Sequence, residues 1–482
     1  MCKLIIVILL VLSMILAACG EKPAEDATTI PTKTVTAKVS AETETTEAPS
    51  VEIPGFADYV CVYEDQRDLA WEQDVVFFAK AFLGDYPADG HPLLVNDDSR
   101  VYKTGGFMSM ANFYQEDMRV RFIEQVYSLL DRIPELSDLG ILYEMQRITA
   151  ELSDTHSSVN LPITESFAFT VEPIYSDNGV QLHAVRLPSE YSDALYGQLV
   201  SINGVSIEDV IDGLSKYISH ENEYWMMFRL TNIIWNDMIT RKGSLQAIGV
   251  VGDQDDTAVF EFVTVDGEHI FAELPAVTPE EYRQIDKIMG DWYASDQFSY
   301  SHYASTYYWY DYAEPSGTLY IRFNWEIEKT DYRYSDFIAD FREAASGNAE
   351  KLIVDLRFNA GGNMQVSQDF VDAFMDMDFE QIYILIDGGS CSNAVTLAAE
   401  LRQKLPNSLL VGTPAGQPAN FFAAAHDYPL PNSGYTFAVS DMWYEYWTDY
   451  EYDALMPDIT VYQTLEDYKN GIDTVLEYVK NR

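Results

Sequence analysis

The spacing of apolar residues divides the chain into a helical first part, a β-rich middle and an alternating last part. Apolar residues recur at helical intervals between residues 68 and 152, which predicts helices over 69–82, 118–132 and 142–152. Residues 167–275 show mostly the alternation of strands, and Asn203-Gly204 predicts a tight hairpin turn before a helix. From residue 276 onward, short apolar strands alternate with amphipathic helices, which is typical of a mainly parallel sheet. We therefore expect a multidomain α/β protein.

The alternating last part gives the most definite elements. Strands are predicted over residues 319–323, 352–356, 382–386 and 409–411. Helices are predicted over residues 334–345 and 367–375, and a third helix buries the apolar positions 394, 397, 398 and 401.

The N-terminus has the pattern of an export signal. Lys3 precedes an apolar run over residues 4–16 that is too short to span a bilayer comfortably. The run ends in Leu-Ala-Ala-Cys19, which resembles a bacterial lipobox. That resemblance implies cleavage after residue 18, a lipid on Cys19 and anchoring at the outer face of a bacterial cytoplasmic membrane. The alternative is an ordinary secretory signal with a chance cysteine. Residues 19–54 lack aromatic residues and are expected to form a disordered tether.

Charge and cysteine content argue against nucleic-acid binding and against a disulfide-stabilised fold. The formal net charge of −47 speaks against nucleic acid as a partner, because phosphates would be repelled. Of four cysteines, only Cys61 and Cys391 lie beyond the leader and the lipobox, so no disulfide framework is expected. We expect these two thiols to remain unbonded to each other. No spacing predicts a structural zinc site, and no metal or cofactor is expected.

Two strand-to-turn-to-helix segments carry the candidate chemistry. The first reads K-L-I-V-D-L-R-F-N-A-G-G-N over residues 351–363, and the second reads I-Y-I-L-I-D-G-G-S-C-S-N from residue 382. The second turn places Ser392 at the start of a helix, where Asn393 and the glycines Gly361 and Gly362 offer backbone N–H groups. A hydroxyl beside free N–H groups is the geometry that acyl transfer needs. Alternatively, Ser392 is only a helix N-cap and the glycines serve only their turn.

These motifs resemble those of the C-terminal processing peptidase and tricorn core protease family, which has D-L-R-x-N-x-G-G and a later G-S-x-S turn. The resemblance implies an N-terminal helical domain over 55–165, a PDZ-like β-rich module over 166–275 and a ClpP/crotonase-like α/β catalytic domain over 276–482. It also implies a serine peptidase acting on peptides or protein C-termini without a metal. Ser392 would be the nucleophile, with an oxyanion hole from Gly361 or Gly362 and Asn393.

The general base departs from the commoner pattern of that family. Processing peptidases pair the serine with a lysine, but the corresponding turn here reads V-G-T-P-A-G-Q over residues 411–417, so Gln417 occupies the lysine position. An amide cannot accept the proton, which excludes a serine–lysine dyad under this alignment. The tricorn-like branch uses a histidine, and His156 in Asp-Thr-His-Ser fits that role. His426 is a weaker candidate.

The third member of the proposed triad would be an acid late in the chain. Glu451 lies in E-Y-D-A-L-M-P-D-I, which resembles the E-x-x-G-x-x-P-D segment of the family with Ala454 in place of glycine. A carboxylate there would orient the imidazole and stabilise its protonated form. Asp449 and Asp453 remain alternatives for this role.

Three functional hypotheses remain open from the sequence. The leading one is a lipid-anchored serine peptidase that uses Ser392, His156 and Glu451. The second is a catalytically inactive protein that binds peptides or apolar ligands on the same fold. The third is an esterase that uses the same residues. The tyrosine-rich segments 292–312 and 443–452 could line a cleft, although strand cores have the same composition. The oligomeric state stays open.

Overall fold

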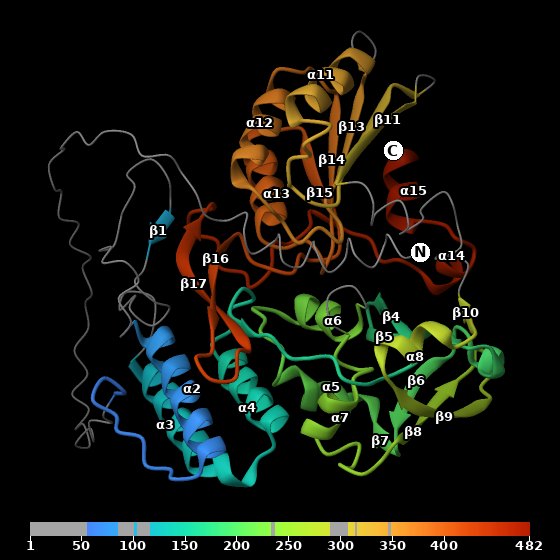
Figure 1. Ribbon diagram of the computed structural model, residues 1–482. Coiled ribbons are helices and arrows are strands. Elements are labelled where there is room, and N and C mark those ends of the chain that lie inside the picture. The colour runs from blue at the N-terminus through green and yellow to red at the C-terminus, as the bar shows by residue number, and fades with distance from the viewer. Residues whose placement is uncertain are drawn as a thin grey trace, which may run out of the picture.

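The computed structural model describes residues 55–84, 101–103, 116–232, 237–289, 307–313, 316–345 and 349–482. The predicted leader, the lipobox cysteine Cys19, the tether and most of the segment 292–312 lie outside the described residues. Three sheets and their covering helices make up the described fold (Figure 1). No helix among the described residues is both long and apolar enough to cross a membrane.

The predicted N-terminal helices are confirmed, and they pack against a hairpin from the far end of the chain. The helices are α2 (Gln66–Leu83), α3 (Glu116–Arg132) and α4 (Asp138–Ala150), with η2 (Ile133–Glu135) between the last two. The hairpin consists of β16 (Asn420–Pro429) and β17 (Thr436–Glu445). The rings of Phe78 and Phe82 in α2 lie 5.2 and 6.0 Å from the ring of Phe437. Aromatic packing therefore fixes the N-terminal helices onto the C-terminal part of the chain.

A four-stranded sheet extends this hairpin along the edge of β17 that faces away from β16. Its order is β1 (Val101–Lys103), β17 and β16, and β2 (Ser158–Val159) also pairs with β17. The register of β2 joins Val159 to Phe437 and Ser158 to Ala438. Because β2 begins two residues after His156, this pairing brings the predicted base toward the C-terminal part of the chain.

The β-rich middle part forms an eight-stranded sheet with short helices. The sheet has the order β10 (Lys287–Met289), β5 (Gly179–Pro188), β6 (Gln198–Ile202), β8 (Thr257–Val263), β9 (His269–Val277) and β3 (Ser166–Phe167), with β4 (Thr170–Ser176) on β5 and β7 (Val205–Ser206) on β6. Its helical segments are η3 (Ser189–Ala194), α5 (Ile207–Ser215), α6 (Glu223–Thr231), α7 (Lys242–Ala247) and α8 (Pro279–Gln284).

The predicted Asn-Gly hairpin is present in this sheet. Asn203 and Gly204 have φ values of 49° and 77° and join β6 to β7, and α5 follows directly. The expected domain boundary after residue 275 falls inside β9, so the eight-stranded sheet continues past it to β10. A PDZ-like character for this part stays a prediction.

The last part contains a six-stranded, mainly parallel sheet, as predicted. Its order is β11 (Tyr308–Ala313), β12 (Thr318–Phe323), β13 (Lys351–Asp355), β14 (Gln381–Ile386), β15 (Ser408–Gly412) and β18 (Ile459–Thr460), and only β11 is antiparallel to its neighbour. One face is covered by α11 (Tyr334–Ala344), α12 (Met364–Met375) and α13 (Asn393–Lys404) (Figure 1). The other face packs on α15 (Thr474–Lys480), which α14 (Leu465–Lys469) precedes.

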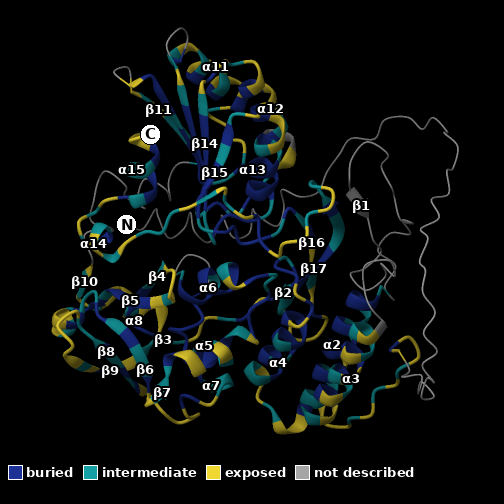
Figure 2. Cartoon of the chain, turned by 180° about the vertical axis from the view of Figure 1, so that it is seen from behind, coloured by how far each residue is buried: buried dark blue, intermediate teal, exposed yellow. Residues whose placement is uncertain are grey.

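Burial explains why this sheet reads as continuous apolar runs in the sequence. The strands β13, β14 and β15 are almost wholly buried between the two layers (Figure 2). A central parallel strand that is covered on both faces needs apolar side chains at nearly every position. The polar residues that follow these strands therefore lie at the edge of the sheet, where a site can form.

Candidate active site

The two predicted turns lie side by side because their strands are neighbours. Parallel pairing of β13 with β14 places Val354 opposite Ile384, so both strands end at the same edge. The backbone N–H of Cys391 donates to the carbonyl oxygen of Asn359 at 2.9 Å. A Cβ atom on Gly361 would lie 2.7 Å from both the Cβ atom of Ser392 and the backbone nitrogen of Asn393. The contact between the turns therefore requires glycine at position 361, where φ is +98°.

Buried ion pairs hold the first turn in place. Asp355, at the end of β13, accepts from the guanidinium groups of Arg322 and Arg357 at 2.7 Å each, and Arg357 also pairs with Asp473 at 2.6 Å. Burial alone would raise the pKa of Asp355, but the charges of the two arginines outweigh it and hold that pKa well below its usual value. The D-L-R part of the motif is therefore a structural anchor that ties the turn to the N-cap of α15.

Ser392 occupies a strained position at the start of α13. Its φ and ψ are 56° and −125°, a combination that costs a non-glycine residue about 1–3 kcal/mol. The side chain is half-buried and accepts no capping hydrogen bond from the helix. Helix capping therefore does not account for this serine, whereas a strained turn that exposes a hydroxyl is typical of catalytic nucleophiles.

The backbone N–H groups beside Ser392 are not equally available. The N–H of Gly361 donates to Oδ1 of Asn359 at 2.8 Å and is already satisfied. The N–H groups of Gly362 and Asn393 have no acceptor among the described residues. Of the predicted oxyanion donors, Gly362 and Asn393 therefore remain free to bind a developing negative charge.

A buried carboxyl group braces the glycine turn from behind. Glu326 is fully buried, and its Oε1 accepts from Nδ2 of Asn359 at 2.9 Å. Its backbone N–H donates to the carbonyl oxygen of Gly361 at 3.2 Å, and its own carbonyl oxygen accepts from Asn363 at 2.7 Å. Burial raises the pKa of Glu326 to about 8, and its Oε2 has no hydrogen-bond partner within the described part of the chain. Glu326 thus fixes both the backbone and the side chains of this turn.

Gln417 lies directly against the turn of Ser392, at the position where the family resemblance implies a lysine. Its Oε1 accepts from the backbone N–H of Ser392 at 2.6 Å and from the thiol of Cys391 at 3.0 Å. Its Nε2 donates to Oε1 of Glu221 at 2.8 Å and lies 3.5 Å from Nδ1 of His156. The fully buried amide therefore links the serine, the histidine and a carboxyl group.

His156 belongs to this network but does not contact the hydroxyl of Ser392. Its imidazole stacks on the ring of Phe421 at 6.0 Å and bonds to the backbone carbonyl of Phe422. No hydrogen bond among the described residues joins His156 to Ser392. Burial lowers the pKa of His156 to about 4, so the imidazole is neutral at pH 7. A neutral imidazole is the form in which histidine acts as a base.

The predicted acid Glu451 is not among the carboxyl groups near His156. Glu451, Asp449 and Asp453 are all exposed, and no hydrogen bond within the described part of the chain joins any of them to His156. The carboxyl groups at the site are the buried Asp154, which accepts from the backbone N–H of His156 at 3.1 Å, and the half-buried Glu221.

Glu221 was not identified from the sequence, since it lies in no recognisable motif. Burial and then the charge of Asp154 raise the pKa of Glu221 well above its usual value. The hydroxyl of Thr155 also donates to Glu221. Thr155, which replaces the glycine of the family motif, thus has Glu221 as its hydrogen-bond partner. This replacement was the only feature of the sequence that could have pointed to Glu221.

The remaining candidates lie apart from this centre. His426 on β16 is exposed and bonds to Asp441 at 2.8 Å. Cys61 and Cys391 are both free thiols, as predicted. No group of histidine, cysteine or acidic side chains among the described residues is arranged to hold a metal ion.

Comparisons with known proteins agree with this geometry. Residues 317–381, which include β12, β13 and the glycine turn, match the model of peptidase family S41. No curated protein matches the sequence. The structure of mature CPAF complexed with lactacystin is 13% identical, covers 86% of this chain and 98% of its own, and has a TM-score of 0.57. Mature CPAF alone has a TM-score of 0.54, also at 13% identity, with coverages of 86% and 97%.

A photosystem II D1 C-terminal processing protease is 11% identical over 86% of this chain and 97% of its own, with a TM-score of only 0.37. The resemblance to the C-terminal processing and tricorn-like serine peptidase family is confirmed by the S41 match, and the α/β architecture is confirmed with it. At these identities the structural likeness to CPAF shows the fold alone.

Proposed function

We propose that this chain is a serine peptidase that cleaves peptides or protein C-termini with Ser392 as its nucleophile. The observation that carries the proposal is the contact between the two turns. An uncapped serine on a strained helix start packs against a glycine turn, and the N–H groups of Gly362 and Asn393 have no other described acceptor. The match of residues 317–381 to the model of peptidase family S41 also supports peptide hydrolysis.

The residues would act in the order that acyl transfer requires. Ser392 attacks the peptide carbonyl while His156 accepts the hydroxyl proton, and His156 then returns a proton to the leaving amine. The N–H groups of Gly362 and Asn393 bind the oxyanion, and each such donor is worth about 3–4 kcal/mol in the transition state. Water then hydrolyses the acyl-enzyme by the same steps.

His156 has to rearrange before it can act as this base. Its ring is engaged by Gln417 and by the carbonyl of Phe422, so the proposal requires rotation toward Ser392 when substrate binds. Catalytic hydrogen bonds are often formed only in the substrate complex. The pair of side chains Gln417 and Glu221 is the polar support on the Nδ1 side of the imidazole. We assign this pair the orienting role that was predicted for Glu451.

The proposed location follows from the N-terminal sequence. A lipid on Cys19 would anchor the protein at the outer face of a bacterial cytoplasmic membrane, and residues 19–54 would hold the folded body away from it. Peptides or proteins exposed on that side would be its substrates.

A non-catalytic binding protein is the second candidate, and one observation favours it. In the described conformation Gln417, rather than a lysine, contacts the turn of Ser392, and His156 bonds to other groups. A protein that had lost catalysis would keep the fold and the cleft but no proton acceptor near the serine.

Labelling with a fluorophosphonate separates the two candidates. The body from residue 51 is treated with the probe beside Ser392→Ala, His156→Ala and the control His426→Ala, which removes an exposed histidine outside the site. The peptidase proposal expects labelling of the parent and of the control, and none of the other two. A folded parent that never labels would exclude the peptidase and leave the binding protein.

A further inference from the structure

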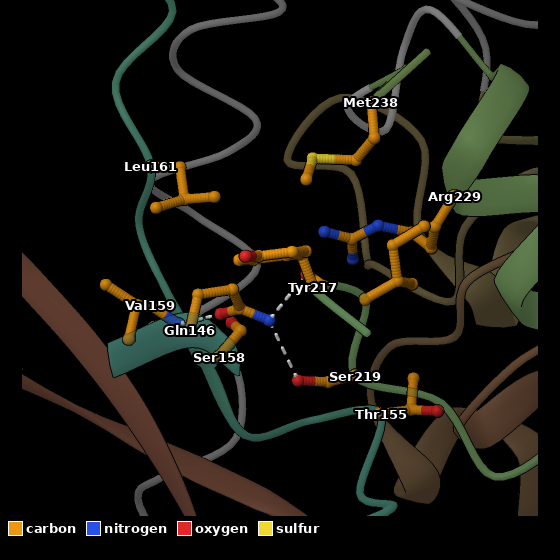
Figure 3. Close-up of a pocket in the computed structure, with 10 residues that line it drawn as sticks. Gln146, Thr155, Ser158, Val159, Leu161, Tyr217, Ser219, Arg229 and Met238 are labelled. Atoms are coloured by element: carbon orange, nitrogen blue, oxygen red, sulfur yellow. Dashed lines mark hydrogen bonds between the residues drawn. The ribbon is translucent and has the colours of Figure 1, made fainter. Parts of the chain in front are cut away.

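A small pocket lies beside the active site, where α4, the segment after His156 and α6 meet. Its cavity volume is about 20 Å³, so it has room only for a group of a few atoms. Polar side chains of Arg229, Ser158 and Ser219 line it together with apolar ones. Figure 3 shows the guanidinium of Arg229 extending into the pocket between Met238 and Tyr217.

Arg229 enters this pocket without a partner of opposite charge. Within the described residues its guanidinium makes no hydrogen bond and no ion pair, and its Nε is buried. The guanidinium carbon lies 5.7 Å from the centre of the Trp225 ring, which is a weak cation–π contact. The Nε–H of Arg229 is therefore a buried donor without an acceptor among the described residues, which is costly unless a ligand supplies the acceptor.

A second arginine, which is buried, adds to the positive charge. Arg241 is only 2% exposed, and all three of its guanidinium nitrogens lack a hydrogen-bond partner among the described residues. Burial and then the charge of Arg241 lower the pKa of Arg229 to about 10, which still leaves Arg229 protonated at neutral pH. The carboxyl group that acts on Arg241 is Asp237, but burial raises the pKa of Asp237 to about 7. This carboxyl is therefore only partly ionised at neutral pH.

Ser219 supplies a neutral donor in the same pocket. Nε2 of Gln146 donates to Oγ of Ser219 at 3.2 Å and to the carbonyl oxygen of Tyr217 at 3.1 Å (Figure 3). Oε1 of the same amide accepts from the N–H of Val159 at 2.6 Å, which fixes the orientation of the amide. Because Ser219 acts as an acceptor toward Gln146, its own hydroxyl hydrogen is left without an acceptor among the described residues.

We propose that this pocket binds a small oxyanion, either a carboxylate or an inorganic phosphate or sulfate, through the guanidinium of Arg229 and the hydroxyl of Ser219. The planar fork of a guanidinium suits two oxygens of such a group. The chain carries 77 acidic against 30 basic residues, so a half-buried and a buried arginine without described ion pairs are an exception that a bound anion explains. The inference concerns binding and does not depend on peptidase activity.

The pocket is connected to the nucleophile turn. Thr155 lines the pocket and donates to Glu221, Glu221 accepts from Gln417, and Gln417 accepts from the N–H of Ser392. An anion in the pocket would therefore lie three hydrogen bonds from the backbone of the serine.

The test is a thermal denaturation of the full chain in the presence of defined anions. Acetate, sulfate and phosphate are titrated at constant ionic strength against chloride. The variants are Arg229→Met, which removes the charge at similar volume, Arg229→Lys, which keeps the charge but not the fork, and the control Arg283→Met, which removes an exposed arginine paired with Glu280. We expect a saturable rise in Tm of about 2 °C in the parent and the control.

Arg229→Met should lose this saturable rise while its anion-free Tm equals or exceeds that of the parent, because an unpaired buried charge has been removed. Arg229→Lys should need about tenfold more anion to reach half of the rise in Tm. If Arg229→Met does not fold, the result with Arg229→Lys decides the test. No saturable rise in the parent with any anion, or an equal rise in Arg229→Met, would overturn the proposal. So would a folded Arg229→Met protein whose anion-free Tm is lower than that of the control.

Two further probes identify the source of the anion. N-acetyl-dialanine with a free carboxylate is compared with its amide. Stabilisation by the acid but not by the amide supports the site and assigns it to a peptide carboxylate. A stronger effect of phosphate or sulfate, with no difference between the acid and the amide, supports the site and assigns it to a free inorganic anion.

Discussion

Gly361→Ala tests whether the contact between the two turns is the catalytic element. The φ of +98° strains any residue with a side chain by about 1–2 kcal/mol, and the smaller entropy of the unfolded alanine chain offsets about 0.4–1 kcal/mol of that. The new Cβ atom would also lie 2.7 Å from the backbone nitrogen of Asn393, a backbone atom that cannot simply rotate away. Such overpacking adds about 1–3 kcal/mol.

The same displacement should reach the reaction rate. Moving the N–H of Asn393 away from the oxyanion position removes one donor, which is worth about 10²–10³ in rate. We expect Gly361→Ala to lose about 2–4 kcal/mol of unfolding free energy in a denaturant titration. In native conditions its rate of fluorophosphonate labelling should fall by about two orders of magnitude.

Gly179→Ala is the matched control for backbone strain. Gly179 has a φ of +109°, but a Cβ atom there meets nothing within 4 Å. The control should lose about 1 kcal/mol or less and label at the parental rate. A folded Gly361→Ala protein that labels as fast as the parent would refute the assignment, and Gly361 would then serve only its turn.

Three further variants test the surroundings of the nucleophile. Ser392→Gly should abolish labelling yet unfold at a higher temperature than Ser392→Ala, because glycine relieves the strain at φ 56° that alanine keeps; an equal Tm for the two would argue against strain. The pKa of Glu326 is raised by burial from 4.5 to about 8, so the folded state holds its proton more tightly and stability falls as pH rises through that window. Glu326→Gln, which can still accept from Asn359, should flatten this slope by about 1.4 kcal/mol per pH unit in unfolding titrations between pH 5 and about 8; an unchanged slope would show that Glu326 is not the titrating group. Glu221→Gln should slow labelling more than Glu451→Gln, because only Glu221 bonds to Gln417; the reverse order would restore the acid that the sequence predicted.

The local elements could be predicted from the sequence because their signals are local. The apolar spacing gave the three N-terminal helices and the parallel strands within a few residues of their observed bounds. The Asn203-Gly204 turn and the glycine turn also follow from backbone preferences that need no tertiary contact. Ser392, Gly362 and Asn393 were proposed from the same turns and from the family resemblance, and their catalytic roles stay predictions.

The acid of the network could not be predicted, because its position depends on packing between distant segments. Glu221 precedes α6 in the middle of the chain, yet it meets Gln417, which is 196 residues later. Glu451 fitted a motif, but the fold leaves it exposed. The role of a carboxyl group in a site depends on its burial and on the groups that face it. Neither property can be inferred from the residues next to it in the sequence.

The sequence by itself determined the elements, the turn that places Ser392 at the start of a helix, and, through the family resemblance, the glutamine at the lysine position 417. Only the tertiary structure decided which N–H groups are free, because the N–H of Gly361 donates to the side chain of Asn359. It also decided that His156 faces Gln417 and Phe422 rather than the serine hydroxyl, and that Arg229 is left without a described partner. Residue preferences act over a few positions, whereas hydrogen-bond partners are settled by which surfaces the folded chain brings together.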